Sequence, residues 1–474
     1  MLVLDNAATY IRRELAAKLL KLFFEDRLEA EIDRIPIEMY PRKSKAIRCC
    51  NYKDRAITRY RIMALLGMSL EEEDDEIATM ASFTKTILKR KKVKEPVLTV
   101  IDEACSACVK INYVVTDICR ACVARPCENN CPKNAITVTD QAKIDQQTCV
   151  NCGICKNVCP YNAIAYVPVP CEEQCPVDAI SKDESGREVI DYTKCIYCGK
   201  CTRACPFGAI MERSQIFDVA KHIKANKEII AMVAPSIIGQ FPGSPEQLSA
   251  GLKLLGFTHV LEVAEGADIT AKNEAAEFIE KMAEGEKMLG TSCCPAYTEA
   301  VKKHAQEFEP FVSHTKTPMS FTADIAATKY PKAIKLFIGP CIAKKFEGLY
   351  DPNVDYVLTY EELGAFFMAK DIDLNEIEAD NFDNSASPFG RGFGVAHGVT
   401  AAVKAALPEG TDVTPVMIDG LTKKGVRTLK AYGKGKAPGN LIEVMSCEGG
   451  CINGPGIVCN PKISARKLNK YLEE

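Results

Sequence analysis

The sequence lacks a strong net charge, a long basic block and a long apolar run. Its 474 residues carry a formal net charge of −3, which gives no electrostatic reason to expect nucleic acid or an anionic membrane as the main partner. The opening segment MLVLDNAATYIRRELAAKLLKLFF has charges every few residues and no small-residue cleavage site, so it fits neither a membrane span nor a secretion signal. We therefore expect a soluble, cytoplasmic protein that binds small molecules or other proteins.

Cysteine is the residue that the sequence has in excess, at 24 positions. In an exported protein so many cysteines would indicate disulfides, but no export signal accompanies them. Most of them fall into short C-x2-C and C-x3-C-P runs, which a disulfide framework has no reason to repeat. The spacing therefore indicates metal ligation.

The mass of 52.0 kDa predicts roughly two to four domains. Residues 1–100 have apolar residues at helical spacing and predict a mainly helical region. We expect its charge runs, EEEDDE at 71–76 and KRKKVK at 89–94, to face solvent, and Cys49 and Cys50 to be unpaired thiols. Residues 101–212 predict a separate cysteine-rich module. Residues 213–474 alternate helical stretches with apolar strands (EIIAMVAP, THVLEV, KLFIGP, DYVLTY), which predicts an α/β domain.

Two runs of the cysteine-rich module, CVNCGICKNVCP and CIYCGKCTRACP, match C-x2-C-x2-C-x3-C-P. In this pattern three cysteines bind one [4Fe–4S] cube and the fourth reaches another cluster. A variant run, CRACVARPCENNCP, resembles the multi-cluster ferredoxin subunits of larger redox enzymes, so we expect an α+β ferredoxin-like region. The cysteines of the three runs are Cys149, Cys152, Cys155 and Cys159; Cys195, Cys198, Cys201 and Cys205; and Cys119, Cys122, Cys127 and Cys131.

Four more cysteines bring the module to sixteen, enough for four cubes. These four are Cys105, Cys108, Cys171 and Cys175. We therefore expect three to four [4Fe–4S] clusters that form an electron relay. The half-motif CP-x-x-A-I recurs at 131, 159, 175 and 205, which indicates a duplicated module. If neighbouring half-motifs pair as in ferredoxins, Cys131 caps the cluster of the 149–155 run and Cys159 that of the 119–127 run; the sequence leaves this pairing open.

Three further cysteine motifs lie in the α/β part: TSCCPAY at 291, GPCIAKKFE at 339 and EVMSCEGGCINGPG at 443. In this order, after ferredoxin repeats, they resemble the three signature motifs of the [FeFe] hydrogenases, TSCCPxW, MPCxxKxxE and ExMxCxxGCxxGGG. The resemblance covers about residues 100–474. It implies a catalytic domain of [FeFe]-hydrogenase type, with two doubly wound lobes around an active-site H-cluster.

In that family the H-cluster is a [4Fe–4S] cube bridged by one cysteine to a two-iron unit that bears CO, cyanide and an azadithiolate and that maturation proteins supply. The ligands that the resemblance implies are Cys294, Cys341, Cys447 and Cys451, with Cys451 as the bridge. Four cysteines from three strand-end loops also meet the count that one cube needs. Cys447 and Cys451 have the spacing of one helical turn, and Gly449 and Gly450 between them would let a bulky cluster approach the backbone.

The resemblance also implies residues around the cluster. Lys344 would donate to a cyanide ligand as a compact cation, with Glu347 as its carboxylate partner. Ala234, Pro235 and Ser236 would cover the two-iron unit, and Met445 would pack over the bridging region.

Proton delivery requires acids within hydrogen-bond reach of one another. Glu274 and Glu277, at i, i+3 of a predicted helix, match the paired glutamates of the family's proton path, and Ser313 would lie between them. Cys293 would be the terminal acid, because a thiol with a reference pKa of about 8.5 stays protonated near neutrality. Neighbouring side chains of an extended segment point to opposite sides, so Cys294 would face the cube while Cys293 faces the proton path.

Four departures from the family's pattern surround these residues. Tyr297 replaces the motif tryptophan, Gly339 a methionine and Met319 a glutamine, and the third motif ends in Gly-Pro-Gly at 454–456. These replacements resemble the less-studied group B clade, and they bear on rate, overpotential and oxygen response while the cluster ligands stay intact.

We expect from this resemblance the reversible reduction of protons to H2 (2 H⁺ + 2 e⁻ ⇌ H2), with a ferredoxin or similar redox protein as electron partner. One alternative is a hydrogen-sensing or redox-signalling homologue, which usually carries a signalling domain and often loses the proton-path residues. The other is an iron–sulfur assembly scaffold of the hydrogenase-like family, which lacks the two-iron unit, the proton path and the long ferredoxin array. The retained path residues disfavour both.

Overall fold

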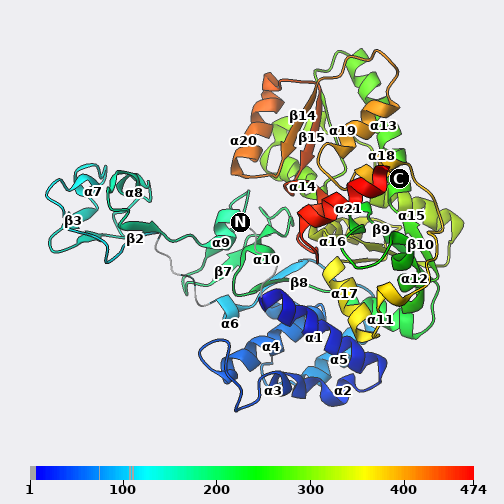
Figure 1. Cartoon of the computed structure of the whole chain (residues 1–474), viewed down its shortest axis with the longest axis horizontal. Helices are drawn as coiled ribbons and strands as arrows, with labels where there is room; N and C mark the ends of the chain where they lie inside the picture. Colours follow the sequence, from blue (N-terminus) through cyan, green and yellow to red (C-terminus); the bar gives the residue numbers. More distant parts are fainter. Residues whose placement is uncertain (1–6, 74, 106–107, 109–111, 474) are drawn as a thin grey trace.

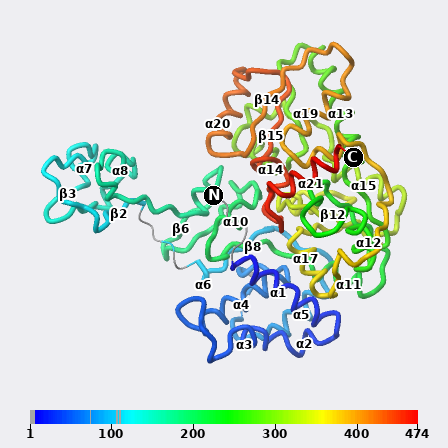
Figure 2. Tube along the Cα trace, in the orientation of Figure 1, coloured from blue at the N-terminus to red at the C-terminus, as the bar shows by residue number. Residues whose placement is uncertain are grey.

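The computed structural model describes residues 7–473, apart from 74, 106–107 and 109–111. The first six residues of the predicted helical region therefore lie outside the described residues. A group of helices lies at one end of the molecule, a small lobe projects from its side, and a large α/β part makes up the rest (Figures 1 and 2). Within the described chain, no helix combines the length and the apolarity that crossing a bilayer would require.

The N-terminal region is mainly helical, as its apolar spacing predicts. Its helices are α1 (Ala7–Phe24), α2 (Leu28–Glu31), α3 (Ile35–Met39), α4 (Asn51–Leu65) and α5 (Met80–Lys89). Helix α1 buries Leu15, Leu19 and Leu20 and packs against α17 (Tyr360–Ala369) of the α/β part, where Arg12 forms an ion pair with Glu361. One continuous apolar core spans both regions, so the N-terminal helices are an integral layer of the molecule.

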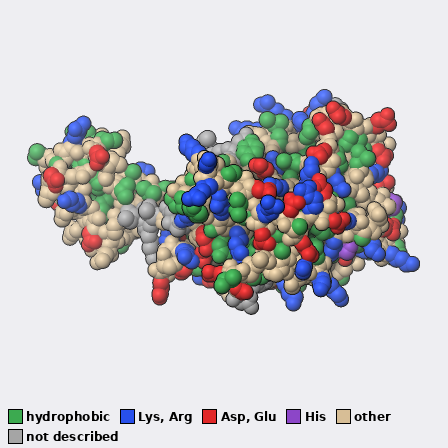
Figure 3. Space-filling view, turned by 90° about the horizontal axis from the view of Figure 1, so that it is seen from below, with side chains coloured by type: hydrophobic (Ala, Val, Ile, Leu, Met, Phe, Trp, Pro, Cys, Tyr) green, Lys and Arg blue, Asp and Glu red, His purple; other side chains and the backbone are tan. Residues whose placement is uncertain are grey.

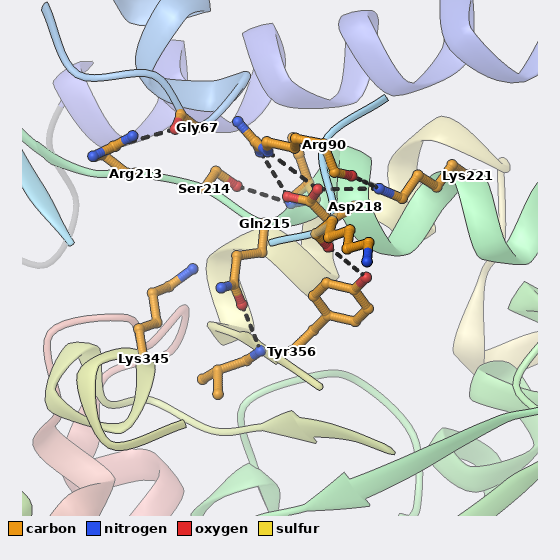
Figure 4. Close-up of polar contacts among 12 residues, drawn as sticks. Gly67, Arg90, Arg213, Ser214, Gln215, Asp218, Lys221, Lys345 and Tyr356 are labelled. Atoms are coloured by element: carbon orange, nitrogen blue, oxygen red, sulfur yellow. Dashed lines mark hydrogen bonds and ion pairs between the residues drawn. The ribbon is translucent and has the colours of Figure 1, made fainter. Parts of the chain in front are cut away.

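The charge run at 89–94 faces solvent only in part, because Lys89, Lys91 and Lys94 are exposed whereas Arg90 and Lys92 are half-buried. Arg90 donates through Nη2 to Asp218 Oδ2 at 2.6 Å and through Nε to Oδ1 at 3.2 Å, and Lys221 Nζ donates to the Arg90 carbonyl at 2.7 Å. Figure 4 shows this group beside Tyr356, whose hydroxyl donates to the Lys91 carbonyl. The run connects the N-terminal helices to α11 (Ile216–Lys224) and β13 (Tyr356–Leu358). It does so through the ion pair of Arg90 with Asp218 and the hydrogen bonds to the Arg90 and Lys91 carbonyls.

Replacing Arg90 by alanine should lower the free energy of unfolding by about 3 kcal/mol. Asp218 is 1% exposed in this pair, and removing one partner leaves the other charge buried and incompletely paired. The shift of the denaturant midpoint measures the loss. The matched control is Arg27→Ala, which breaks exposed ion pairs and should cost less than about 1 kcal/mol; equal midpoints for the two variants would contradict the interpretation.

Two parallel sheets form the α/β part, as the alternating pattern predicts. The first sheet has the order β10-β9-β12-β13 and the second β11-β15-β14. The strands are β9 (Ile229–Val233), β10 (His259–Glu262), β11 (Leu289–Gly290), β12 (Ile334–Ile338), β13, β14 (Pro415–Asp419) and β15 (Leu441–Met445). The four apolar runs noted in the sequence are the four strands of the first sheet. Strands β9 and β15 are buried throughout, as expected for parallel strands covered on both faces.

Helices connect and cover these strands. They are α11, α12 (Pro245–Leu255), α13 (Ala264–Ala283), α14 (Pro295–His304), α15 (Pro318–Lys329), α16 (Ile342–Tyr350), α17, α18 (Pro388–Gly392), α19 (Gly398–Ala406), α20 (Lys423–Ala431) and α21 (Pro461–Glu473). Helix α13 contains both predicted proton-path glutamates. The fold is thus the predicted α/β class.

The cysteine-rich module is built from short antiparallel strand pairs, and one part of the module is inserted within the sequence of the other. Strands β1 (Leu98–Val100) and β8 (Ile210–Glu212) pair, as do β6 (Ile180–Lys182) and β7 (Glu188–Ile190), beside α6 (Asp102–Cys105), α9 (Pro170–Gln174) and α10 (Lys200–Ala204). Between α6 and α9 the chain makes the projecting lobe from β2 (Tyr113–Val115), α7 (Pro126–Asn129), β3 (Ile136–Val138), β4 (Ala142–Ile144), α8 (Ile154–Val158) and β5 (Ile164–Tyr166). One ferredoxin-like unit is therefore inserted within the sequence of another.

Candidate functional site

A cavity lies where the carboxyl ends of strands from both sheets approach one another. Its empty volume is about 840 Å³, including the part that is open to solvent, and it lies at the edge where open parallel sheets place their ligands. The sequence-predicted residues that line it are Ala234, Pro235, Ser236, Cys293, Cys294, Cys341, Lys344, Met445, Cys447 and Cys451. Four loops that are far apart in the sequence thus bring the implied cluster ligands and their neighbours to one place.

Each ligand cysteine sits in a turn that follows a strand. Cys294 and Cys341 are the N-cap residues of α14 and α16. Pro295 occupies the first position of α14, which suits its fixed φ and missing N–H. The local sequence therefore presents both sulfurs at the edge of the sheet.

The helical turn expected between Cys447 and Cys451 is not formed. Gly449 and Gly450 have φ values of 81° and 94°, in the region that favours glycine, and the short helix starts only at Cys451. A Cβ on Gly450 would lie 2.7 Å from the Ala396 nitrogen. The glycine is thus required by the close approach of this neighbouring backbone.

The cavity suits a large, sulfur-ligated cluster better than a single ion. Besides the four thiols and Lys344, its wall includes the apolar side chains of Val263, Met319, Phe337 and Phe393. Among the described residues, no three His, Cys, Asp or Glu side chains lie close enough together to share one metal ion. Four thiols around an apolar space of this volume fit the iron–sulfur part of the expected cofactor.

Lys344 is a buried cation at the cavity wall. Its Nζ donates to Glu347 Oε2 at 2.6 Å, and Thr317 Oγ1 donates to Glu347 Oε1 at 2.6 Å. Burial opposes the charge, but the Glu347 carboxylate outweighs it and raises the pKa of Lys344. The structure thus holds a permanent positive charge beside the thiols.

The Ser236 hydroxyl points to a residue that the motifs did not identify. It lies 2.8 Å from the Tyr360 hydroxyl, which in turn is 3.3 Å from the Ala234 carbonyl. Tyr360 is fully buried and fixes the loop after β9 against α17. No spacing rule connects position 360 with position 236, so this contact had no signal in the sequence.

Glu274 is fully buried next to the TSCC segment. Its Oε1 accepts hydrogen bonds from the Ser292 backbone N–H at 2.8 Å and from the Ser292 hydroxyl at 3.0 Å. Burial, partly offset by these bonds, raises the pKa of Glu274 to about 7. Burial, with Glu274 nearby, also raises the pKa of the Cys293 thiol well above its usual value. The thiol is thereby kept protonated, and the carboxyl group can exchange a proton near neutrality.

The second glutamate lies further out, and Ser313 contacts only this one of the two. Glu277 Oε2 accepts from Ser313 Oγ and from Thr315 Oγ1 at 3.1 Å. Ser292 Oγ donates to the Thr315 carbonyl at 2.6 Å, and both serines line an open groove. Ser292 and Thr315, which the sequence analysis missed, therefore connect the surroundings of the two carboxyl groups. Ser292 had a weak signal, since it adjoins Cys293.

Two cysteine groups lie in the projecting lobe, each around its own small cavity. The first group is Cys119, Cys122, Cys127 and Cys159. The second is Cys131, Cys149, Cys152 and Cys155. The structure thus brings together four thiols from two half-motifs in each case, in the crossed arrangement that ferredoxin-like pairing predicts.

Two more groups lie between the lobe and the α/β part. Burial raises the pKa of Cys201, and the neighbouring thiols Cys198, Cys195 and Cys175 raise it further. The second group comprises Cys171, which interacts with Cys205 and Cys108, and Cys105, which also interacts with Cys205. Cys198 lines the large cavity itself, so the first of these two groups adjoins the candidate active site.

The repeated CP-x-x-A pattern has a structural cause. In each copy the alanine N–H donates to the cysteine sulfur, over 3.2–3.4 Å. The donors and acceptors are Ala135 to Cys131, Ala163 to Cys159, Ala179 to Cys175 and Ala209 to Cys205. The residue before each alanine has φ of 51–57°, which Asn, Asp and Gly tolerate best, and these are the residues found there. Hydrogen bonds to the sulfurs are one of the levers that set a cluster's potential.

Three family models match separate parts of the chain. Residues 227–455 match the family model of the iron-only hydrogenase large subunit, C-terminal domain. Residues 188–211 match a 4Fe–4S binding domain, and residues 119–169 match the LdpA Fe–S cluster-binding domain.

Individual relatives include hydrogenases and an iron–sulfur cluster assembly factor. NADP-reducing hydrogenase subunit HndD of Solidesulfovibrio fructosivorans is 27% identical over 52% of this chain and 53% of its own length, so this chain spans about half of that relative. Iron hydrogenase 1 of Clostridium pasteurianum is 27% identical over 72% of this chain and 69% of its own. The cytosolic Fe–S cluster assembly factor narfl of Xenopus tropicalis is 24% identical over 52% and 66%.

A solved structure of [FeFe]-hydrogenase HydA(deltaEFG) is 24% identical, covering 52% of this chain and 84% of its own, with a TM-score of 0.44. The family match coincides with the part of the chain that forms the large cavity, and the 4Fe–4S matches coincide with cysteine groups of the relay. Residues 227–455 therefore form an iron-only hydrogenase-like domain, and segments similar to 4Fe–4S-binding domains precede it.

Proposed function

We propose that the chain is a cytoplasmic [FeFe] hydrogenase that catalyses 2 H⁺ + 2 e⁻ ⇌ H2 with a ferredoxin or similar protein as electron partner. One observation carries the proposal: a single cavity is bordered by the relay thiol of Cys198, by the four implied ligands and by Cys293. Electrons and protons would thus reach the same enclosed space from different sides. A protein that only stores clusters has no need for a supply of protons to this space.

The residues present fit the H-cluster of the resembled family. Cys294, Cys341, Cys447 and Cys451 would hold it, and Lys344 would supply a fixed cation beside its cyanide ligands. Ser236, Ala234, Pro235 and Met445 would enclose it. When bound, the cluster supplies the iron centre at which electrons and protons combine, and maturation proteins would deliver its two-iron unit.

The proton supply follows from the chain's own groups. Cys293 holds its proton next to the cavity because burial disfavours the thiolate. Glu274, with a pKa of about 7, would return a proton to the thiol after each transfer. Ser292 and the outer pair of Ser313 and Glu277 would connect this carboxyl group with the open groove.

The second candidate function is iron–sulfur assembly, which the similarity to the assembly factor narfl favours. The two functions differ in one physical requirement: turnover of H2 needs the two-iron unit as well as the cubes. A hydrogen-sensing role would keep the cofactor and show little turnover.

Anaerobic expression with the maturation proteins, followed by infrared spectroscopy and a hydrogen assay, tests the proposal. We expect CO and cyanide bands together with H2 evolution from reduced viologen. The matched control omits the maturation proteins and should retain the cubes without these bands. Fully iron-loaded protein that shows neither bands nor H2 would contradict the proposal and leave the assembly role.

A further inference from the structure

We propose that the loop between α3 and α4 is a docking surface at which an acidic one-electron carrier protein delivers electrons to the cysteine group 105/108/171/205. We call residues 42–53 the basic strip. The inference rests on the proposed function, and it names the place where that function's electrons enter.

The basic strip carries positive charge with little compensation. The stretch PRKSKAIRCCNYKDR at 41–55 contains six Lys and Arg residues and a single acid. That acid, Asp54, is buried and accepts hydrogen bonds from the Ile47 and Arg48 N–H groups at 2.9 and 3.4 Å. The Asp54 carboxylate thus points away from solvent and stabilises the conformation of the loop.

The outer cations of the strip are free to meet a partner. Arg42, Lys43 and Lys45 are exposed, and within the described part of the chain they form no ion pair. Figure 3, seen from the side of the N-terminal helices, shows Lys and Arg side chains gathered on the main body next to the projecting lobe. Unpaired charges of one sign attract an oppositely charged protein from a distance and raise its association rate.

The strip is fastened to the chain segments that carry the cysteine group. Arg48 donates through Nη1 to the Ala104 carbonyl at 3.1 Å and through Nη2 to the Phe207 carbonyl at 2.7 Å. Ala104 directly precedes Cys105, and Phe207 follows Cys205 by two residues. A protein that docks on the strip therefore approaches this group closely, and electron transfer needs such proximity because its rate falls steeply with distance.

Apolar side chains lie among the charges. Ile47 is 59% and Tyr52 is 64% exposed, although both belong to residue types that are usually covered. An aromatic and aliphatic centre within a charged rim is the composition of protein interfaces, and redox encounters use small ones. The matching partner is a small protein with an acidic surface around its redox centre, and ferredoxins meet this description.

The electron balance is simple. In each encounter the reduced carrier loses one electron and the cube gains it, and two encounters supply the two electrons that reduce two protons to one H2. Cys171 of this group also interacts with Cys201, so a cube held by the group would adjoin the one held by the group that contains Cys198. Entry at the strip thus reaches the active site without passage through the projecting lobe.

The test is a triple charge reversal, Arg42→Glu, Lys43→Glu and Lys45→Glu, in the full chain. With a reduced acidic [4Fe–4S] ferredoxin at low salt, we expect kcat/KM to fall about tenfold or more, while the rate with reduced methyl viologen stays unchanged. Added salt should weaken the wild-type reaction and have little effect on the variant. The matched control reverses three exposed cations at the other end of the molecule, Lys404, Lys430 and Lys436.

An unchanged ferredoxin rate, or an equal loss in the control or with viologen, would overturn the proposal. A second readout separates it from the proposed function: the rate at which reduced ferredoxin bleaches the iron–sulfur absorbance of protein prepared without the two-iron unit. Suppose that the wild-type protein evolves no H2, and that ferredoxin reduces the clusters of the strip variant more slowly than those of the wild type and of the control. The docking proposal then holds and the hydrogenase proposal fails. Clusters that are reduced equally fast in both proteins refute docking.

Discussion

Replacing Cys293 by alanine should lower H2 evolution by about a hundredfold or more, which is the range that a positioned acid contributes. Cys293 lines the cavity but belongs neither to the four implied cluster ligands nor to the relay cysteines, and burial holds its pKa well above the usual value. Without it no protonated group of the TSCC segment faces the space where the reaction takes place. Electron supply and cluster binding involve other residues and should persist.

The measurement compares turnover, iron content and the infrared bands of the variant with those of the wild type. The iron content and the CO and cyanide bands should be retained, because Cys294 and the other implied ligands are unchanged. Cys459→Ala is the matched control: Cys459 is half-buried and outside the cavity, and its loss should leave turnover intact. Normal turnover in Cys293→Ala would refute its role as the proton donor.

Replacing Glu274 by glutamine should also lower turnover by about a hundredfold and should change the pH dependence. The side chain keeps its shape and its bonds to Ser292, but it no longer releases or accepts a proton. In the wild type the protonated fraction of Glu274 falls as the pH rises through about 7, so H2 evolution should decline over this range. The residual activity of the variant should lack this transition.

Stability gives an independent measurement for the same variant. Folding raises the pKa of Glu274 from 4.5 to about 7, so between these values the folded state binds more protons than the unfolded state. Stability therefore falls as the pH rises from 4.5 to 7, by an amount on the order of 3 kcal/mol. Glu274→Gln should lose this dependence, whereas Glu280→Gln, an exposed position on the same helix, should keep it. If the free energy of unfolding changed with pH in the same way for wild type and Glu274→Gln, this would contradict the raised pKa of Glu274.

Several elements were predictable because their signals are local. Three ligands of a ferredoxin-type cube lie within a few residues of one another, so C-x2-C-x2-C-x3-C-P indicates a cluster before any fold is known. The four apolar runs became the four strands of one sheet, because parallel strands buried on both faces leave few polar positions. The turn after each CP pair likewise explains why Asn, Asp or Gly recurs there.

Other features depend on contacts between distant segments. Cys108 and Cys171 are separated in the sequence by the residues of the projecting lobe. In the structure these two thiols nevertheless interact with each other. The charge run at 89–94 was predicted to face solvent, but in the structure Arg90 donates a hydrogen bond to Asp218. Gly450 looked like space for a cofactor, whereas a neighbouring backbone requires it.

The sequence by itself therefore determined which residues can bind iron–sulfur clusters, the α/β class of the large domain and the family that it resembles. These depend on spacing and periodicity, which a linear pattern preserves. Only the tertiary structure decided which half-motifs share a group of four thiols, that Cys198 borders the same cavity as Cys293, and that Ser292, Thr315 and Tyr360 join the site. Such relations arise when strand ends from separate sheets and segments hundreds of residues apart pack together, and no local pattern records that packing.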